Sequence, residues 1–323
     1  NIYEAARQGN IEEMKRSLRT GADVNVNAGK YNATPLHIAA EGNHTDIAEL
    51  LLEKGAEINA KAQGGVTPLH VAALENSNEV AKYLIKNGAD IYARDNYNGT
   101  PLHLAAQEGA TDVVKVLIRS GVDVDVEGVF DKTPLAYAAP KGHSEIVKVL
   151  VDNGANVNTK GGSTDATPLV FAAGKGHVEV IKVLVDNGAN VNTRAKQNVT
   201  PLHMAALGCH KKTTQLLLDN GADITAKRKG GNTALHVAAI SGAVEVAELL
   251  IHNNADVNGT QKDGMTPLHW AARRGHPQMA QLLLENGANI SAKDKNGDTP
   301  LQVAIAMEHS ELAKLLRRHK NQN

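Results

Sequence analysis

The sequence predicts an all-α solenoid of stacked helix-turn-helix units with projecting β-turn loops, about ten units including two caps. The first observation is a repeated triplet, Thr-Pro-Leu or once Thr-Ala-Leu, at steps of 33 residues with a single step of 34. It begins at Thr34, Thr67, Thr100, Thr133, Thr167, Thr200, Thr233, Thr266 and Thr299. The second is composition, because 42% hydrophobic but only 3% aromatic residues suits a core of Leu, Val, Ile and Ala. The third is length, since 323 residues exceed one ordinary core, whereas each unit of an array packs only on its neighbours.

Each unit contains the local signals of two short helices. Thr is a good N-cap and Pro fits the first helical turn, where no amide hydrogen is needed. Gly or Asn then ends the first helix, as at Gly109 and Gly142. A second helix with apolar residues at helical spacing stops at Gly-Ala, as at Gly188, because glycine accepts the left-handed cap conformation. Asn-Val-Asn or Asp-Val-Asn follows and favours a turn.

Paired alanines lie at the same place in nearly every unit. Ala39-Ala40, Ala72-Ala73 and their equivalents let neighbouring helices approach closely, and larger side chains there would overpack the core at about 1–3 kcal/mol. The last unit has Ala304-Ile305 instead. We expect the larger residue to be tolerated there because no further repeat packs against it.

The pattern resembles the ankyrin-repeat family, whose signature is Thr-Pro-Leu-His-x-Ala-Ala. The signature is intact at Thr34–Ala40, Thr67–Ala73, Thr100–Ala106, Thr200–Ala206 and Thr266–Ala272, and differs at Thr233–Ala239 only by Ala234. The predicted boundaries are 1–27 for an N-terminal capping repeat, then 28–60, 61–93, 94–126, 127–160, 161–193, 194–226, 227–259 and 260–292, and 293–323 for a C-terminal capping repeat. Charged residues in both caps fit the need for polar terminal units.

Fourteen histidines raise the question of catalysis or metal binding. Six follow the motif leucine, and the resemblance implies that their imidazoles bond backbone and the motif Thr: His37, His70, His103, His203, His236 and His269. Equivalent atoms of neighbouring repeats are about 8–10 Å apart, too far to share a zinc ion. His143, His177, His210, His276 and His309 recur at another repeat position, to which the same reasoning applies. No catalytic, phosphate-loop or cysteine-pair motif occurs, and the single Cys209 is expected to be inert. We therefore expect no enzyme activity, cofactor or metal.

Departures from the repeat give the candidate binding residues. The resemblance implies a concave binding face made of loop tips and first helices. The matching positions precede each Thr and follow each alanine pair. The apolar candidates are Tyr31, Leu74, Tyr97, Phe130, Leu207 and Ile240, and the basic ones after alanine pairs are Lys141, Lys175, Arg273 and Arg274. Scattered surface apolar residues are also normal, and that alternative stays open.

Two adjacent units lack the motif histidine. Ala136 and Val170 replace it, Pro140 follows in the first unit, and the 34-residue step lies between the two. These deviations indicate a local distortion, a specialised surface or simple sequence drift.

Charge differs between the two halves. Residues 1–161 carry 16 Lys/Arg and 21 Asp/Glu, a net charge of −5, whereas residues 162–323 carry 18 and 14, a net charge of +4. Basic residues at steps of 33 are expected to form one stripe along the loops: Arg194, Lys196, Lys227, Arg228, Lys229, Lys262, Lys293 and Lys295. Such a stripe favours an acidic partner surface, while ordinary solvated loop charges are the alternative. The overall charge of −1 disfavours nucleic acid.

Two asparagines match a modification pattern that the resemblance implies. Leu, five residues, an acid, an aliphatic residue and Asn mark targets of asparaginyl hydroxylases in ankyrin repeats, and Asn59 and Asn258 lie in such patterns. The alternative is that both only stabilise a turn.

The expected function is a protein-interaction scaffold with a partner of unknown identity. The alternative is a non-catalytic targeting or regulatory region of a larger enzyme, channel, toxin or bacterial effector. Open-ended stacking with polar caps favours a monomer, and no apolar run is long enough for a membrane span. One cysteine fits the cytoplasm or another reducing intracellular compartment, or the host cytosol for a bacterial effector.

Overall fold

The protein is all-α, as predicted. The computed structural model describes residues 1–27 and 31–322, and in these it contains 20 α-helices, four short 3-10 helices and no β-strand. The chain forms two compact units, Asn1–Ser163 and Thr164–Asn323. The division falls in the loop with the one-residue insertion, within the predicted repeat 161–193. The start of the predicted repeat 28–60 and the last residue of 293–323 lie outside the described residues.

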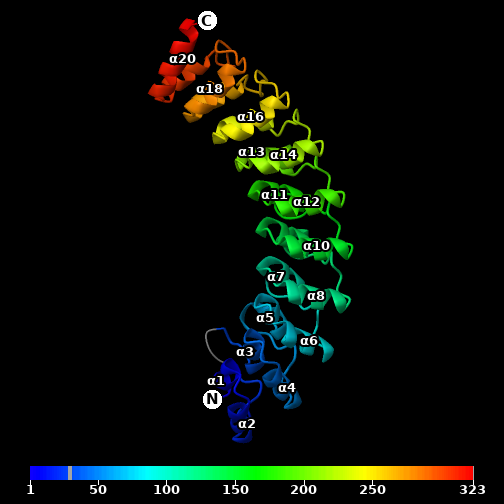
Figure 1. Cartoon of the computed structure of the whole chain (residues 1–323). Helices are drawn as coiled ribbons and strands as arrows, with labels where there is room; N and C mark the ends of the chain where they lie inside the picture. The colour runs from blue at the N-terminus through cyan, green and yellow to red at the C-terminus, as the bar shows by residue number, and fades with distance from the viewer. Residues whose placement is uncertain (28–30, 323) are drawn as a thin grey trace. The chain divides into compact units, whose positions relative to one another are not determined.

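The first unit is a stack of five helix pairs in chain order (Figure 1). Its first helices are α1 (Ile2–Gln8), α3 (Pro35–Glu41), α5 (Pro68–Leu74), α7 (Pro101–Glu108) and α9 (Pro134–Ala138). Its second helices are α2 (Ile11–Arg19), α4 (Thr45–Glu53), α6 (Asn78–Lys86), α8 (Thr111–Arg119) and α10 (Ser144–Asp152). Its 3-10 helices are η1 (Gln63–Gly65), η2 (Val129–Asp131) and η3 (Ala139–Lys141). First helices pack on first helices and second helices on second helices, so the unit has two layers.

The second unit repeats this plan with five more pairs. Its first helices are α11 (Pro168–Lys175), α13 (Pro201–Leu207), α15 (Ala234–Ser241), α17 (Pro267–Arg274) and α19 (Pro300–Ala306). Its second helices are α12 (Val178–Asp186), α14 (Lys211–Asp219), α16 (Val244–His252), α18 (Pro277–Glu285) and α20 (Ser310–Gln322). Its one 3-10 helix is η4 (Lys196–Asn198).

The helix ends follow the residues that the sequence places there. Thr200 is extended, with φ −104° and ψ 164°, and its side chain accepts a hydrogen bond from the amide of His203 while Pro201 opens α13. Gly176 ends α11 with φ 74°, and a Cβ on it would lie 2.6 Å from the ring of His210. Left-handed geometry and close approach together therefore require glycine at this position.

The core lies between the two helix layers of each unit. The paired alanines and every motif leucine except Leu301 are almost completely buried, as Ala205 and Leu202 illustrate. Full burial of each leucine contributes about 1.5–3 kcal/mol. Ile305 is 48% exposed, in contrast to its buried alanine equivalents. Among the described residues Ile305 therefore lies on an open side of α19, which agrees with the expectation that this repeat tolerates a larger residue.

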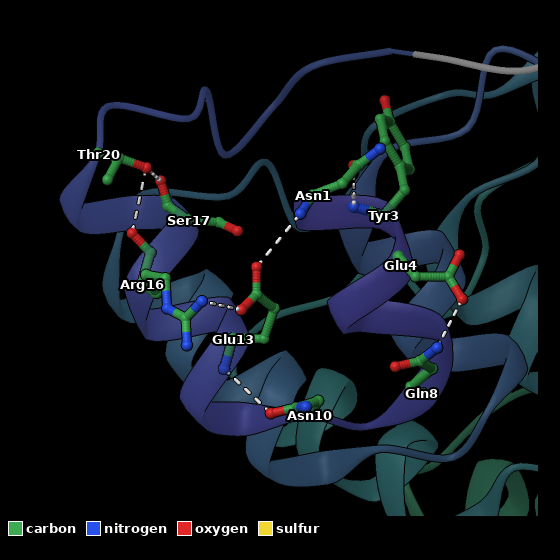
Figure 2. A network of polar contacts seen from close by, with 9 residues as sticks. All are labelled: Asn1, Tyr3, Glu4, Gln8, Asn10, Glu13, Arg16, Ser17 and Thr20. Carbon is green, nitrogen blue, oxygen red and sulfur yellow. Dashed lines mark hydrogen bonds and ion pairs between the residues drawn. The ribbon is translucent and has the colours of Figure 1, made fainter.

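The N-terminal helix pair, α1 and α2, contains a network of polar contacts (Figure 2). Asn10 caps α2 by accepting from the amide of Glu13 at 3.0 Å, and Glu13 pairs with Arg16 at 3.2 Å. The hydroxyl of Thr20 donates to the carbonyl of Ser17 at 2.9 Å and ends the helix. A capping repeat needs a polar outer surface, and the role of residues 1–27 as such a repeat stays a prediction.

Candidate functional site

Six histidines tether neighbouring repeats. In each, the motif Thr amide donates to Nδ1, as Thr200 does to His203 at 3.2 Å, and the threonine hydroxyl lies 2.8 Å from the same nitrogen. Because an amide hydrogen can only be donated, Nδ1 is unprotonated and Nε2 carries the proton. Nε2 donates to a carbonyl of the next loop: His37 to Val66, His70 to Gly99, His103 to Lys132, His203 to Asn232, His236 to Met265 and His269 to Asp298, at 3.0–3.3 Å.

Burial keeps these six imidazoles neutral, and their role is structural. Desolvation lowers the pKa of all six below the usual 6.5, and to about 4 for His103, His203 and His236. Both ring nitrogens are occupied by protein partners, so neither is available for proton transfer or a metal. In the described residues no three His, Cys, Asp or Glu side chains are placed to hold a metal ion.

A second set of histidines forms hydrogen bonds to the preceding repeat, whereas the first set bonds to the following one. These rings precede the second helix of a pair, and Nε2 donates to the end of the previous repeat's first helix. The pairs are His44 to Arg7, His143 to Gln107, His210 to Gly174, His276 to Ile240 and His309 to Arg273, at 3.0–3.2 Å. His44 belongs to this set although it was not predicted from the sequence, because it lies ten residues after its motif threonine, as the other members do.

The two adjacent repeats in which Ala136 and Val170 replace the motif histidine each leave a threonine hydroxyl unsatisfied. Thr133 Oγ1 and Thr167 Oγ1 are buried without a hydrogen-bond partner. In the second of these repeats Val170 forms a buried cluster with Ala166 and Ala195, against which Val199 packs. An apolar contact therefore replaces the polar tether. Near the other repeat, Tyr137 packs edge-on against His103 with ring centres 5.4 Å apart.

The last repeat uses a different residue in place of the motif histidine, and sequence reasoning missed its role. Gln302 replaces the histidine, and its Oε1 accepts from the amide of Thr299 at 2.8 Å and from its hydroxyl at 3.0 Å. A glutamine three residues after a threonine is the usual capping-box pattern, so the signal was present in the sequence.

The two hydroxylation candidates also join neighbouring repeats. Asn59 Oδ1 accepts from the amide of Asp90 at 2.9 Å. Asn258 Oδ1 accepts from the amide of Asn289 at 2.7 Å, and its Nδ2 donates to Gly287 at 3.0 Å. Both side chains are largely exposed despite these bonds. Their structural role is therefore clear, while hydroxylation stays a prediction.

The basic loop residues lie on one edge of the second unit. Lys196, Lys229, Lys262 and Lys295 occupy equivalent places, since their amides donate to Thr164, Gln197, Gly230 and Asp263 of the preceding loops at 2.7–3.0 Å. All four are exposed, as are Arg194, Lys227 and Lys293, while Arg228 is half-buried. The Lys295 ammonium pairs with Asp263, so one charge of this stripe is partly compensated.

The loops of the first unit carry aromatic tips instead. Tyr31, Tyr97 and Phe130 occupy equivalent repeat positions and are 64%, 77% and 69% exposed. Phe130 also has a positive φ of 53°, which is uncommon for a bulky residue. Such exposed aromatic side chains are typical anchors in protein interfaces.

The candidates after the alanine pairs differ in exposure. Leu74 and Leu207 are 37% and 48% exposed, whereas Ile240 is half-buried. The basic members Lys141, Lys175, Arg273 and Arg274 are all exposed. The Arg273 guanidinium lies 5.6 Å from the ring centre of Trp270, so part of its charge already has an aromatic partner.

Stacked helix pairs of about 33 residues with hydrogen-bonded loops define a repeat protein whose units repeat the same side-chain tethers. A family model described as ankyrin repeats in three copies matches residues 2–95, 92–161, 160–228, 195–261 and 236–323. The chain therefore belongs to the ankyrin-repeat family. No helix in the described part of the chain is long and apolar enough to cross a membrane.

Curated relatives match over short stretches. NF-kappa-B inhibitor cactus of Drosophila melanogaster is 40% identical over 58 residues, 18% of this chain and 12% of that protein. Ankyrin repeat and SOCS box protein 5 of Bos taurus is 47% identical over 60 residues, 19% of this chain and 18% of that protein. Histone-lysine N-methyltransferase EHMT1 of Homo sapiens is 39% identical over 59 residues, 18% of this chain and 4% of that protein. The chain thus spans less than a fifth of the length of each of these three relatives.

Proposed function

We propose that this chain is a protein-interaction module without catalytic activity of its own. Ankyrin repeats are generally protein–protein interaction modules. The observation that carries the proposal is the set of exposed aromatic and basic side chains that hydrogen-bonded loops hold at equivalent repeat positions. Neither kind of side chain is needed to form the loops, and both are suited to contact a partner.

Within this proposal the two units offer different surfaces. The first unit presents Tyr31, Tyr97 and Phe130 as apolar anchors, and the second presents its basic loop edge to an acidic protein surface. Neutral overall charge makes nucleic acid the weaker candidate ligand. The lone, exposed Cys209 favours a reducing intracellular compartment, where it stays reduced. Packing of each repeat only on its neighbours favours a monomer.

A second candidate is a regulatory or targeting region of a larger protein. The similarity to a short part of a histone-lysine N-methyltransferase is the observation that favours it. Transcript mapping of the complete reading frame separates the two candidates, because a catalytic or channel domain on the same chain would favour the second.

Crosslinking mass spectrometry in native lysate identifies the partner. The association rate of the purified partner with this chain then tests the interaction. Reversal of Lys196, Lys229, Lys262 and Lys295 to Glu should slow association at least tenfold and flatten its salt dependence, since the stripe acts over about a 10 Å Debye length at 0.1 M. Reversal of four helical lysines of the same unit, Lys182, Lys211, Lys212 and Lys314, is the matched control. Equal association rates for both quadruple variants would reject a role for the loop edge.

A further inference from the structure

Three successive loops of the second unit surround a hollow of about 620 Å³. We call it the finger hollow. Its lining residues are Gln197, Asn198, Lys227, Arg228, Lys229, Gly230, Gly231, Thr260, Gln261 and Lys262. Four of them are cationic, none is a carboxylate, and none is aromatic or aliphatic. The chemistry of the walls therefore selects for negative charge and for polar ligands.

Backbone hydrogen bonds hold the three loops together, so the charged ends of the lysine side chains are not needed for this and can contact a ligand. The Lys229 amide donates to Gln197 at 2.7 Å and the Lys262 amide to Gly230 at 3.0 Å. Gly231 has φ 86°, and a Cβ on it would lie 3.1 Å from the Lys262 nitrogen, so the loops meet at backbone distance. Within the described chain the ammonium groups of Lys229 and Lys262 form no ion pair. The Lys227 ammonium has only a marginal contact, 3.5 Å from the carbonyl of Thr260.

The middle loop also contains unsatisfied polar atoms. Arg228 Nε and Asn232 Oδ1 are buried without a hydrogen-bond partner. A buried polar atom of this kind is destabilising, and native proteins contain few of them. The guanidinium is therefore partly removed from water, and water screens its charge less than that of an exposed side chain.

We propose that the finger hollow binds a phosphoryl group carried by a side chain of the protein partner. This inference rests on the proposed function and names the group that the basic edge recognises. A phosphorylated side chain has a charge of about −1.5 to −2 and three acceptor oxygens, and it matches a convergent arginine–lysine cluster better than one carboxylate does. The walls contain no aromatic ring for base stacking and no apolar side chain for insertion into a bilayer, so a protein ligand is favoured.

The test is a titration of the whole chain followed by amide chemical shifts, with three pentapeptides: Gly-Gly-phosphoserine-Gly-Gly and its Glu and Ser counterparts. We expect saturable shifts of the amides at 227–231 and 261–262. The phosphopeptide should bind at least tenfold more tightly than the Glu peptide. The variant Arg228→Gln, Lys229→Gln, Lys262→Gln should lose this binding at least tenfold.

A matched triple variant separates a local site from net charge. Lys182→Gln, Lys212→Gln and Lys314→Gln remove the same charge from exposed helical positions of the same unit outside the hollow. This control should bind the phosphopeptide within twofold of the parent. Unchanged far-ultraviolet spectra of both variants show that the fold is intact.

Three results would overturn the inference. Equal affinity for the Glu peptide and the phosphopeptide would leave only general attraction to acidic surfaces. Retained binding in the hollow variant would place the site elsewhere. Binding at least tenfold tighter to phosphatidylcholine vesicles with 5% phosphatidylinositol 4,5-bisphosphate would make the ligand a lipid headgroup. Phosphatase treatment of the captured partner distinguishes the two proposals: binding that survives it supports the interaction module but rejects the phosphoryl group.

Discussion

The repeats that begin with α11 and α13 share Thr-Pro-Leu but differ at the next residue. In the α13 repeat His203 bonds Thr200 and reaches the Asn232 carbonyl of the following loop at 3.1 Å. In the α11 repeat Val170 occupies this place, packs on Ala195, and leaves the Thr167 hydroxyl without a partner. The first arrangement is a directional hydrogen-bonded tether and the second is an apolar contact.

The difference shows that the helix pair does not depend on one interface chemistry. Both first helices begin with an extended threonine and a proline at the first turn, and both bury their alanine pairs. Backbone capping and alanine packing therefore suffice for the fold, while the histidine adds stability that depends on pH. The following predictions test this contrast from the largest expected effect to the smallest.

Acid should destabilise the histidine-bearing repeats first. The unfolded histidines take up protons below pH 6.5, but the folded ones resist until about pH 4. The free energy of unfolding is therefore fully retained above pH 6.5 and falls as the pH drops toward 4, by up to about 1.4 kcal/mol per pH unit for each histidine. Urea denaturation between pH 7.5 and 5 measures this loss. A stability that does not change over that range would contradict the buried neutral imidazoles.

His203→Ala should lower stability by about 3 kcal/mol. It leaves the buried Thr200 amide without its acceptor and opens a cavity between repeats. Val170→Ala, at the same position of the neighbouring repeat, removes only apolar contact and should cost about half as much. Urea denaturation gives the difference, and hydrogen exchange should localise the faster opening to α13. Equal losses in both variants would show that the tether adds nothing beyond packing.

Val170→His should stabilise the α11 repeat by about 1 kcal/mol at pH 7.5. The imidazole gives the Thr167 hydroxyl a partner and brings a donor toward the Val199 carbonyl. The gain should disappear near pH 5, as for the other histidines. Val170→Asn is the control, because its shorter side chain cannot span both partners and should be destabilising. Equal destabilisation by His and Asn would mean that the apolar cluster cannot accept a ring.

Thr167→Val should change stability by less than about 0.5 kcal/mol. The lost hydroxyl has no partner, so replacing it with a methyl group of similar size removes an unsatisfied atom. Thr200→Val should cost about 1–2 kcal/mol because its hydroxyl contacts His203 and accepts from the same residue's amide. Thermal unfolding of the pair gives the comparison, and similar losses at both positions would contradict the unsatisfied state of Thr167.

Much of the local structure could be predicted from spacing. Threonine caps, proline at the first turn, left-handed glycines and exposed Ile305 all follow from the requirements of a single residue or a single end of the stack. The absence of histidine at Ala136 and Val170 was visible, but its consequence was not. Whether a buried hydroxyl finds another partner depends on atoms from several segments, and periodicity does not report their distances.

The sequence by itself determined the family, the helix order and the positions of the basic and aromatic loop residues, because these depend on a pattern repeated along the chain. Only the tertiary structure decided that Asn59 and Asn258 join neighbouring repeats and that Lys295 is partly neutralised by Asp263. It also decided that residues from three loops surround one hollow. Such features are contacts between residues about 30 positions apart in the sequence. The stacking of repeats determines these contacts, and local propensity does not.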